Sequence, residues 1–303
     1  QAGITIKSAD KAFTLDNKTN YPAGTLIIEA RSNNNDLSAN IQKITKSTGA
    51  VVNGVNTSWV TKGPSFGSGN TVTMSAPKIA MAWGDSVSSL SAGNTRFVIE
   101  RQFNYPVTAI RVNKLTRADL GNYHVLILPS GHYKNSLGKN GADNIKNWVE
   151  QGGVLITLGN ATRYAADSEV GLLAVKRELA YKEKTESKAK KDDEKESTTV
   201  GTLYKDKATL LKASENSKDS PDFVAGVLAN IEVDQEHWLT AGVHKKLVGM
   251  AYGNDIYAPI KLEAGKNLAW FSDAKNVLAS GYLWEENKKQ LAYKPFLIHQ
   301  PTG

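Results

Sequence analysis

The sequence predicts an α/β fold in which a parallel β-sheet is covered by helices and followed by a β-rich part. Two apolar runs, 124–128 and 154–158, have the length of buried strands, and each is followed by a turn that contains glycine. Between them, 140–151 has the periodicity of an amphipathic helix and ends at a pair of glycines. Strands that alternate with helices through short turns favour a parallel sheet with both faces covered.

Residues 1–75 are rich in Asn, Ser, Thr and Gly, and we interpret them as an N-terminal β/α extension or linker region. A short apolar run at 25–29 indicates a strand, and a helix capped by Asp36 should continue to about residue 46. A second strand is expected at 51–55. The composition of 62–70, KGPSFGSGN, is typical of a loop or linker.

The α/β core is assigned to residues 76–177. It should contain a buried strand at 78–82, a helix from Ser91 to about residue 104, and a strand at 107–112, before the two apolar runs and the helix described above. The apolar residues expected to face the core from the first of these helices are Phe97, Val98 and Phe103. In the second helix, 140–151, they are Ile145, Trp148 and Val149.

The composition changes abruptly at 178–200. Six lysines stand against seven acidic residues in ELAYKEKTESKAKKDDEKE, so the net charge is near zero. We interpret this segment as a charged insertion, either a solvated helix or a disordered stretch. Residues 201–303 should form a β-rich C-terminal part that completes or decorates the core. Its predicted strands are 226–233, 246–250, 260–262, 268–271, 278–283 and 296–299.

Composition excludes several classes of function. The chain has no cysteine, so it forms no disulfides and no thiolate metal site. The formal net charge is +7, but the basic residues are spread along the chain and form no recognition motif for nucleic acid. No apolar run approaches the roughly 18 residues of a membrane span. We therefore predict no nucleic-acid partner and no membrane span.

The strongest candidate site lies where the two apolar strands end. Open parallel sheets bind ligands at the carboxyl ends of their strands. The residues that follow these strands and could line a ligand pocket are Ser130, Gly131, His132, Thr157 and Asn160. In the stretch LPSGH, Ser130 lacks the G-x-S-x-G elbow of a hydrolase nucleophile, and a histidine two residues away does not make a triad. We assign no catalytic residue to this chain.

Other motifs favour structural roles. The five histidines lack the H-x-x-E or H-E-x-x-H spacing of zinc ligands, so no metal site is predicted. The glycines at 67–69 and 138–141 could hold phosphate but fit neither established phosphate-loop pattern, and ordinary turns are favoured. Aromatic residues gather late in the chain, where they could form a carbohydrate or peptide platform but more often fill a core. They are Trp238, Tyr252, Tyr257, Trp270, Tyr282 and Trp284.

Four stretches carry a resemblance to a known family. The sequences NYHVLILPSG (122–131) and NIKNWVEQGGVLITLG (144–159) resemble the class I glutamine-amidotransferase-like domain, which has a flavodoxin-like parallel sheet. Together with GVLANIEVDQEHWLTAG (226–242) and ASGY (279–282), they are similar to the C-terminal region of bacterial zinc carboxypeptidases related to carboxypeptidase A. In those proteins an amidotransferase-like domain follows the peptidase domain.

The resemblance implies that this chain is an accessory part of a larger enzyme. Active amidotransferases have G-x-C-x-G at the second strand end, but here Thr157 occupies the cysteine position, and a threonine without a base is a weak nucleophile. The implied parent is a secreted or periplasmic zinc metallopeptidase, a hydrolase active in proteolysis. Its peptidase domain would hold the zinc through H-x-x-E and a later histidine, and this chain would need no cofactor.

The implied partners are the peptidase domain of the same polypeptide and its peptide or envelope substrate. The alternative is a divergent α/β hydrolase or a small-ligand-binding module that uses the crevice at the strand ends.

Overall fold

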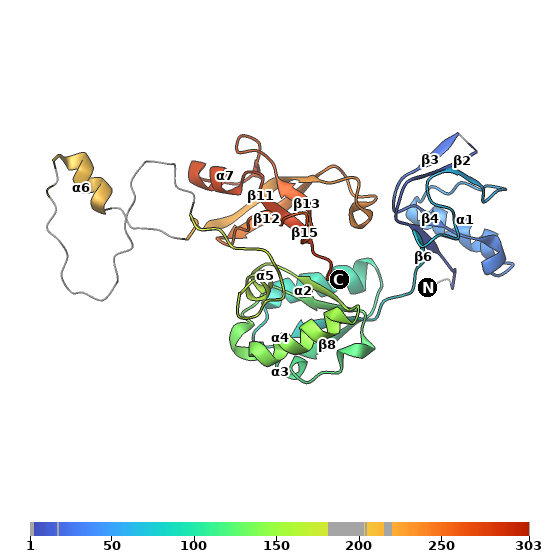
Figure 1. The fold of residues 1–303 in the computed structure, drawn as a ribbon, viewed down its shortest axis with the longest axis horizontal. Coiled ribbons are helices and arrows are strands. Elements are labelled where there is room, and N and C mark those ends of the chain that lie inside the picture. The colour runs from blue at the N-terminus through green and yellow to red at the C-terminus, as the bar shows by residue number, and fades with distance from the viewer. Residues whose placement is uncertain (1–2, 17, 181–202, 204, 215–219, 303) are drawn as a thin grey trace.

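The structure, a computed structural model, consists of a small N-terminal β unit, a parallel-sheet unit and an antiparallel-sheet unit (Figure 1). It describes residues 3–16, 18–180, 203, 205–214 and 220–302. In these ranges no helix has the length and apolar character needed to cross a bilayer. Of the charged insertion predicted at 178–200, residues 181–200 lie outside the described residues.

The N-terminal unit contains two antiparallel sheets of three strands each, in the orders β4-β1-β6 and β3-β2-β5. Their small common core consists of Ala9, Phe13, Leu15 and Ile27. The strands are β1 (Lys7–Ala9), β2 (Phe13–Leu15), β3 (Thr19–Tyr21), β4 (Leu26–Ile27), β5 (Val60–Lys62) and β6 (Thr71–Thr73).

The predicted N-terminal helix is confirmed as α1 (Leu37–Thr48), which ends at Gly49 in the left-handed conformation, but the side chain of Asp36 makes no capping hydrogen bond. The strand predicted at 51–55 is wrong, because Val51 is 88% exposed and this stretch pairs with no other strand. The place beside β2 is taken by β5 instead. An apolar, β-branched run forms a strand only where a partner backbone lies next to it.

The middle unit is built on a parallel sheet with the strand order β10-β9-β7-β8. Its strands are β7 (Ile79–Trp83), β8 (Val107–Arg111), β9 (Val125–Leu128) and β10 (Val154–Thr157). All four lie within about one residue of the predicted strands. The alternation of strands and helices in the sequence therefore identified this sheet correctly.

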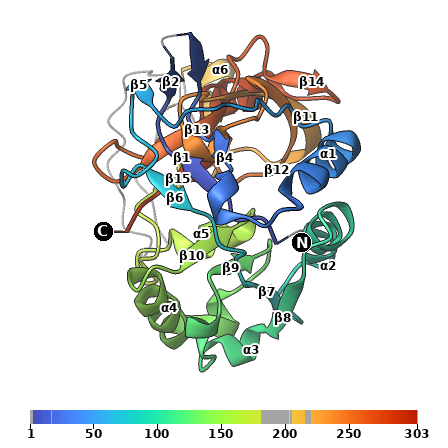
Figure 2. The same ribbon diagram turned by 90° about the vertical axis from the view of Figure 1, so that its right-hand side faces the viewer.

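Helices cover the two faces of this sheet unequally. On one face, Ala82, Leu126 and Leu128 pack against three helices, and the buried Ile145 and Trp148 come from the longest of them. These helices are α3 (Val112–Leu115), α4 (Lys134–Glu150) and α5 (Asn160–Ala165). The other face packs on α2 (Ser89–Phe97) and the π-helical segment Val98–Gln102. Figure 2 shows α3 and α4 on the side of the sheet away from the antiparallel unit.

The prediction for α2 is partly wrong. The helix is present, with Ser88 as its N-cap, but Phe97, Val98 and Phe103 are 57%, 38% and 70% exposed. Ile99 packs on the sheet instead. A π-helical turn, which adds a residue to the helical repeat, covers Val98–Gln102 and precedes Phe103.

The C-terminal unit is an antiparallel sheet of five strands, with the order β12-β11-β13-β15 and β14 paired to β11. The strands are β11 (Val224–Val233), β12 (Lys246–Gly253), β13 (Lys266–Phe271), β14 (Leu278–Ser280) and β15 (Pro295–His299). The helix α7 (Glu285–Leu291), which the sequence analysis did not predict, follows β14. A separate helix, α6 (Lys207–Ser214), precedes this unit.

One strand predicted in this unit is wrong and another is shorter than predicted. At 260–262 the backbone N–H and C=O of Ile260 bond to the Asn267 side chain at 3.0 and 2.9 Å, and Leu262 is 86% exposed in a turn. The amide side chain satisfies the groups that a neighbouring strand would have used. The strand predicted at 278–283 ends at Ser280.

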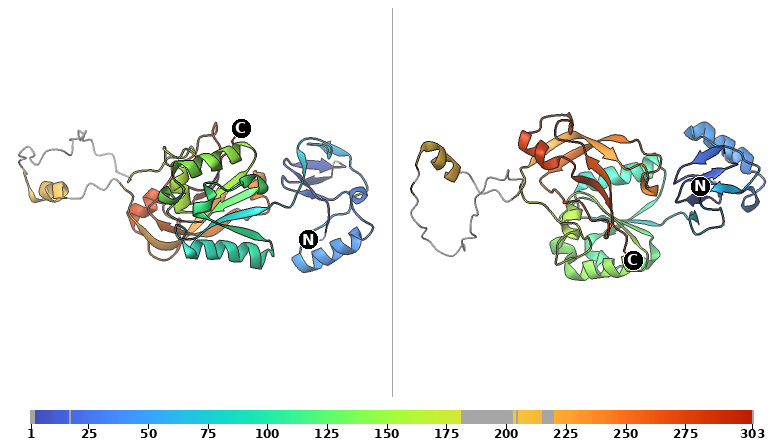
Figure 3. Two further views of the ribbon diagram at one scale, coloured as in Figure 1. Left: turned by 90° about the horizontal axis from the view of Figure 1, so that it is seen from below. Right: turned by 45° about the horizontal axis from the view of Figure 1, so that its top comes forward.

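The units touch through a few specific contacts. Arg177 forms a β-bridge with Tyr257, and Lys294 pairs with Glu178 at 2.7 Å, so the segment after the parallel sheet is held against the antiparallel sheet. Gly24 of the N-terminal unit lies so close to Ala241 that a side chain at position 24 would collide with it. Figure 3 shows the N-terminal unit joined to the others by one stretch of chain.

Candidate functional site

The carboxyl ends of β7, β9 and β10 meet at one edge of the parallel sheet, as they must when neighbouring strands run in the same direction. Three loops follow these strands, at 84–88, 129–133 and 158–160. The sequence-predicted site residues lie in the second and third loops or at the end of β10.

The first two loops are held together by backbone hydrogen bonds. Val87 and Gly131 form an antiparallel bridge, and the N–H of His132 donates to the carbonyl of Ser86 at 2.8 Å. A Cβ at Gly131 would collide with that same carbonyl oxygen. Glycine is therefore required here because two backbones approach closely.

Ser130 connects all three loops. Its N–H donates to the Ser91 hydroxyl at 3.0 Å, and its carbonyl accepts from the N–H of Ser88 at 2.8 Å. Its own hydroxyl accepts the N–H of Asn160 at 3.2 Å. Gly159, with φ of 52°, gives the serine room, since a Cβ there would lie 2.9 Å from the Ser130 hydroxyl oxygen.

Thr157 and His132 take no part in this cross-link through their side chains. The hydroxyls of Thr157 and Thr162 share a hydrogen bond of 3.0 Å, which ties the end of β10 to α5. The side chain of His132 is exposed, and no described residue makes a hydrogen bond or ion pair with its ring. The structure thus brings together Ser130, Gly131 and the backbone of Asn160, and leaves Thr157 and His132 in separate environments.

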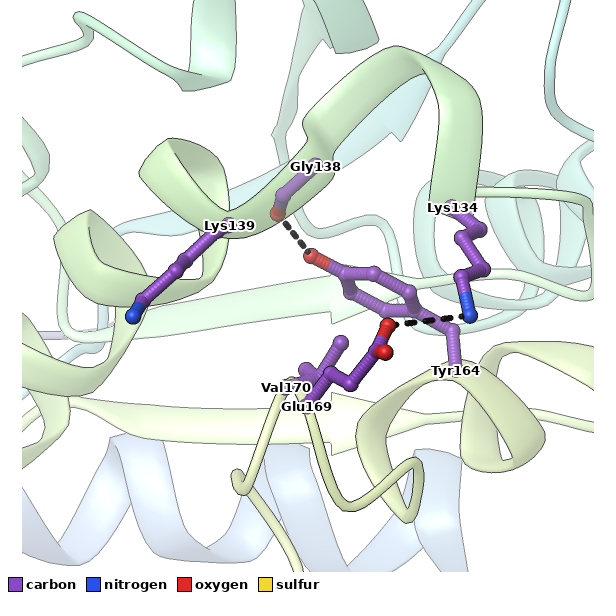
Figure 4. A pocket seen from close by; sticks show the side chains of 6 residues that line it. All are labelled: Lys134, Gly138, Lys139, Tyr164, Glu169 and Val170. Carbon is purple, nitrogen blue, oxygen red and sulfur yellow. Dashed lines mark hydrogen bonds and ion pairs between the residues drawn. The ribbon is translucent and has the colours of Figure 1, made fainter.

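A pocket of about 480 Å³ lies beside this edge, behind the first turn of α4 (Figure 4). It is lined by Lys134, Gly138, Lys139, Tyr164, Glu169 and Val170. None of these residues was predicted as part of a site. The only signal in the sequence is the glycine-rich stretch 138–141, for which an ordinary turn is the favoured interpretation.

Gly138 interrupts α4 at this pocket. Its φ of 54° and ψ of −159° break the helical repeat, so its carbonyl points away from the helix and accepts the Tyr164 hydroxyl at 3.0 Å. Burial raises the pKa of the Tyr164 phenol to about 12.

The charges at the pocket are mostly paired. Lys134 lies 3.2 Å from both Asp167 and Glu169, and these carboxylates raise the pKa of its ammonium group. Lys139 extends away from them in Figure 4, and no described residue pairs with it. A second hollow of about 410 Å³ on the other side of Gly138 adds Thr116 and Arg117. The two hollows together present more positive than negative charge.

Three of the five histidines have structural contacts. His124 accepts the N–H of Lys78 through Nδ1 at 2.9 Å, at the beginning of β9. His237 accepts the N–H of Leu239 through Nδ1, and its ring centroid lies 5.1 Å from that of His299. Within the ranges that the structure describes, no three His, Asp or Glu side chains gather as metal ligands would.

The late aromatic residues divide into exposed and covered groups. Tyr252, on β12, is 68% exposed, and Tyr282 and Trp284, between β14 and α7, are 71% and 60% exposed. Trp238, in a short 3₁₀-helix, is 52% exposed. Tyr257 and Trp270 are half-buried. The two residues Tyr282 and Trp284 pack edge to face with centroids 5.1 Å apart.

Neither a protein-family model nor any curated protein matches this chain.

Proposed function

We propose that this chain is a non-catalytic accessory module of a secreted or periplasmic zinc carboxypeptidase, built on a flavodoxin-like sheet of the class I glutamine-amidotransferase type. It would support the peptidase domain of the same polypeptide, or bind the peptide or envelope substrate of that domain. The zinc and its ligands would belong to the peptidase domain.

The proposal that the chain is not catalytic is supported mainly by the contacts of Ser130. An attacking serine needs a base on its hydroxyl and free space in front of it. The hydroxyl of Ser130 instead accepts a backbone N–H from Asn160 and fits against Gly159, so it acts as a cross-link between strand ends. Thr157, which stands at the position of the amidotransferase cysteine, shares its hydrogen bond with another hydroxyl, that of Thr162.

The test is an assay of the purified chain with added zinc on an N-acylated dipeptide and on a p-nitrophenyl ester. We expect no turnover above that of Ser130→Ala, and no zinc retained after dialysis. Turnover that disappears in Ser130→Ala or His132→Ala, with the far-UV circular dichroism unchanged, would contradict the proposal. It would favour the alternative of a divergent α/β hydrolase.

The family part of the proposal has its own test, which is the reading frame that precedes the codon for Gln1 in the natural gene. The proposal requires an upstream peptidase domain with H-x-x-E and a later histidine. A reading frame that encodes neither would remove the carboxypeptidase assignment while leaving the assay result intact.

A second candidate, a small-ligand-binding module, is favoured by the pocket next to α4. No described residue forms an ion pair with Lys139, so its ammonium group could bind an anionic group in the pocket. The Tyr164 ring lines the same pocket. The test is a titration with inorganic phosphate, monitored by the amide chemical shifts of residues 134–141. Shift changes that saturate in wild type and are absent in Lys139→Ala would support this candidate.

A further inference from the structure

The two edges of the antiparallel sheet differ in how they are protected. The edge strand β15 has five residues, begins with Pro295 and has two register shifts against β13. Proline and irregular pairing are the usual means of preventing a sheet edge from pairing with another chain. The other edge strand, β12, has eight residues, contains no proline and has one charged residue, Lys246; its single register shift against β11 lies near its end, between the pairs that Ala251 and Gly253 form.

Hydrogen-bond alternation shows which groups of β12 point outward. Val233 donates its N–H to the carbonyl of Lys245 at 2.9 Å, which fixes the bonded pairs between β11 and β12. Bonded and non-bonded pairs alternate in an antiparallel ladder. The N–H and C=O groups of Val248, Met250 and Tyr252 therefore point away from β11. Among the described residues, β12 pairs with β11 alone.

The same three residues present exposed apolar side chains. Val248, Met250 and Tyr252 are 58%, 70% and 68% exposed and lie on one face of the sheet. The Tyr252 ring contacts Phe223 edge to face at 5.2 Å, and Met250 pairs with Leu228, which is 47% exposed. We call Phe223, Leu228, Val248, Met250 and Tyr252 the β12 edge patch. It combines open backbone groups with an apolar surface, so its complement is another β-strand with apolar side chains.

We propose that the β12 edge patch binds a second copy of this chain, by antiparallel pairing of the two β12 strands around a two-fold axis at Met250. In this register Met250 lies opposite Met250 of the partner subunit, and Val248 lies opposite Tyr252 of the partner subunit. Lys246 then lies opposite the uncharged Asn254 of the partner subunit, so no like charges meet. The two five-stranded sheets become one continuous sheet.

The strand is self-complementary in this register, which is what a two-fold interface requires. The outward backbone groups of each copy become the bonded pairs of the new ladder. Aromatic residues opposite β-branched residues are favourable cross-strand pairs, as at Tyr252 and Val248. This inference does not depend on the accessory role proposed above.

The test is the molar mass in solution, measured by light scattering and by sedimentation over a dilution series. We expect wild type to reach twice the chain mass of 32.8 kDa at high concentration. Met250→Lys and Met250→Glu each place like charges across the axis and should each be monomeric. An equal mixture of the two variants should recover the dimer, because opposite charges then face each other.

Two further variants separate pairing from folding. Val248→Pro removes only an outward N–H and should give a folded monomer, as judged by circular dichroism. Val154→Lys changes an apolar residue that is 52% exposed on the edge strand β10, and should remain dimeric.

A monomeric wild type at every concentration would overturn the proposal, and so would a dimer that Met250→Lys leaves intact. A monomer whose Tyr252 surface binds chito-oligosaccharide would also overturn it and assign the face to a glycan.

Discussion

At the carboxyl edge of the parallel sheet, single residues decide how closely the loops approach one another. Gly131 allows its backbone to contact that of Ser86 and Val87, and Ser130 fills the space that Gly159 leaves. Hydrogen bonds of 2.8–3.2 Å then join the three loops through the backbone and hydroxyl of the serine. These hydrogen bonds join residues that lie 30 or more positions apart in the sequence, so the three loops form one connected surface.

The first prediction compares two glycine substitutions. Gly131→Ala should lower the free energy of unfolding by about 1–3 kcal/mol, because the added Cβ collides with backbone that cannot move alone. Gly93→Ala, in the middle of α2 with nothing within 4 Å of the added Cβ, should raise it by about 1 kcal/mol. Urea unfolding of both variants measures the two free energies of unfolding. Equal changes in the two variants would contradict the explanation that Gly131 is required because two backbones approach closely.

The second prediction concerns pH. Burial, followed by the positive charges of His299 and Lys266, lowers the pKa of His237 below its ordinary value of 6.5, and burial followed by Lys266 lowers that of His299. The unfolded chain then binds protons more readily than the folded one, so stability should be complete above pH 6.5 and fall as the pH decreases toward the lowered values.

The variant that tests this is His237→Asn, whose side-chain oxygen can still accept the N–H of Leu239. Urea unfolding between about pH 5 and 8 should show a shallower loss of stability at low pH than wild type shows. An identical slope in the two proteins would mean that His237 contributes nothing to the pH dependence.

At the scale of elements, each helix and strand depends on local signals and on a partner. The helix α2 begins where Ser88 accepts the N–H of Ser91, and α1 ends at Gly49 with φ of 71°. Both signals can be read from sequence. The interruption of α4 at Gly138 is different, because the tertiary contact of Tyr164 with the Gly138 carbonyl holds it in place.

The third prediction tests that interruption. Gly138 has backbone angles that are essentially restricted to glycine, so Gly138→Ala should lower the free energy of unfolding by about 1–3 kcal/mol, although nothing lies within 4 Å of the added Cβ. Lys139→Ala, at the next and exposed position, should change it little. Thermal unfolding distinguishes the two, and tolerance of Gly138→Ala would show that α4 can continue without the break.

At the scale of the whole molecule, the described residues bury several separate cores. One belongs to the N-terminal unit, two lie on the two faces of the parallel sheet, and one belongs to the antiparallel sheet. Units with their own cores need not unfold in one step. The contact between Gly24 and Ala241 joins the N-terminal unit to the antiparallel unit, but neither residue belongs to the core of the N-terminal unit.

The fourth prediction follows from these separate cores. Phe13 is 3% exposed and packs on Tyr21 and Phe66 with centroids 5.0 and 5.3 Å away. Phe13→Ala should destabilise the N-terminal unit by about 3–5 kcal/mol and leave the parallel sheet unaffected. Hydrogen exchange should show lost protection in β1 and β2 with unchanged protection in β7 and β9. Uniform loss along the chain would mean that the molecule unfolds as one unit.

The sequence was sufficient to predict the parallel sheet, because its two central strands, β7 and β9, are buried apolar runs and because strands and helices alternate along this part of the chain. It also located the strand-end edge, since parallel strands must end together, and it placed Ser130 and Gly131 there. It did not reveal the pocket at Lys134 and Tyr164, because no local pattern marks contacts between residues about 30 positions apart.

The sequence does not show which apolar residues are covered, because this depends on how the elements pack. Val51 and Phe97 have the composition of core residues but are exposed, because burial depends on whether a partner surface is present and not on the residue itself. The same reason applies to β12. Its sequence predicts a strand, and the strand order alone makes it an edge whose backbone is open on one side.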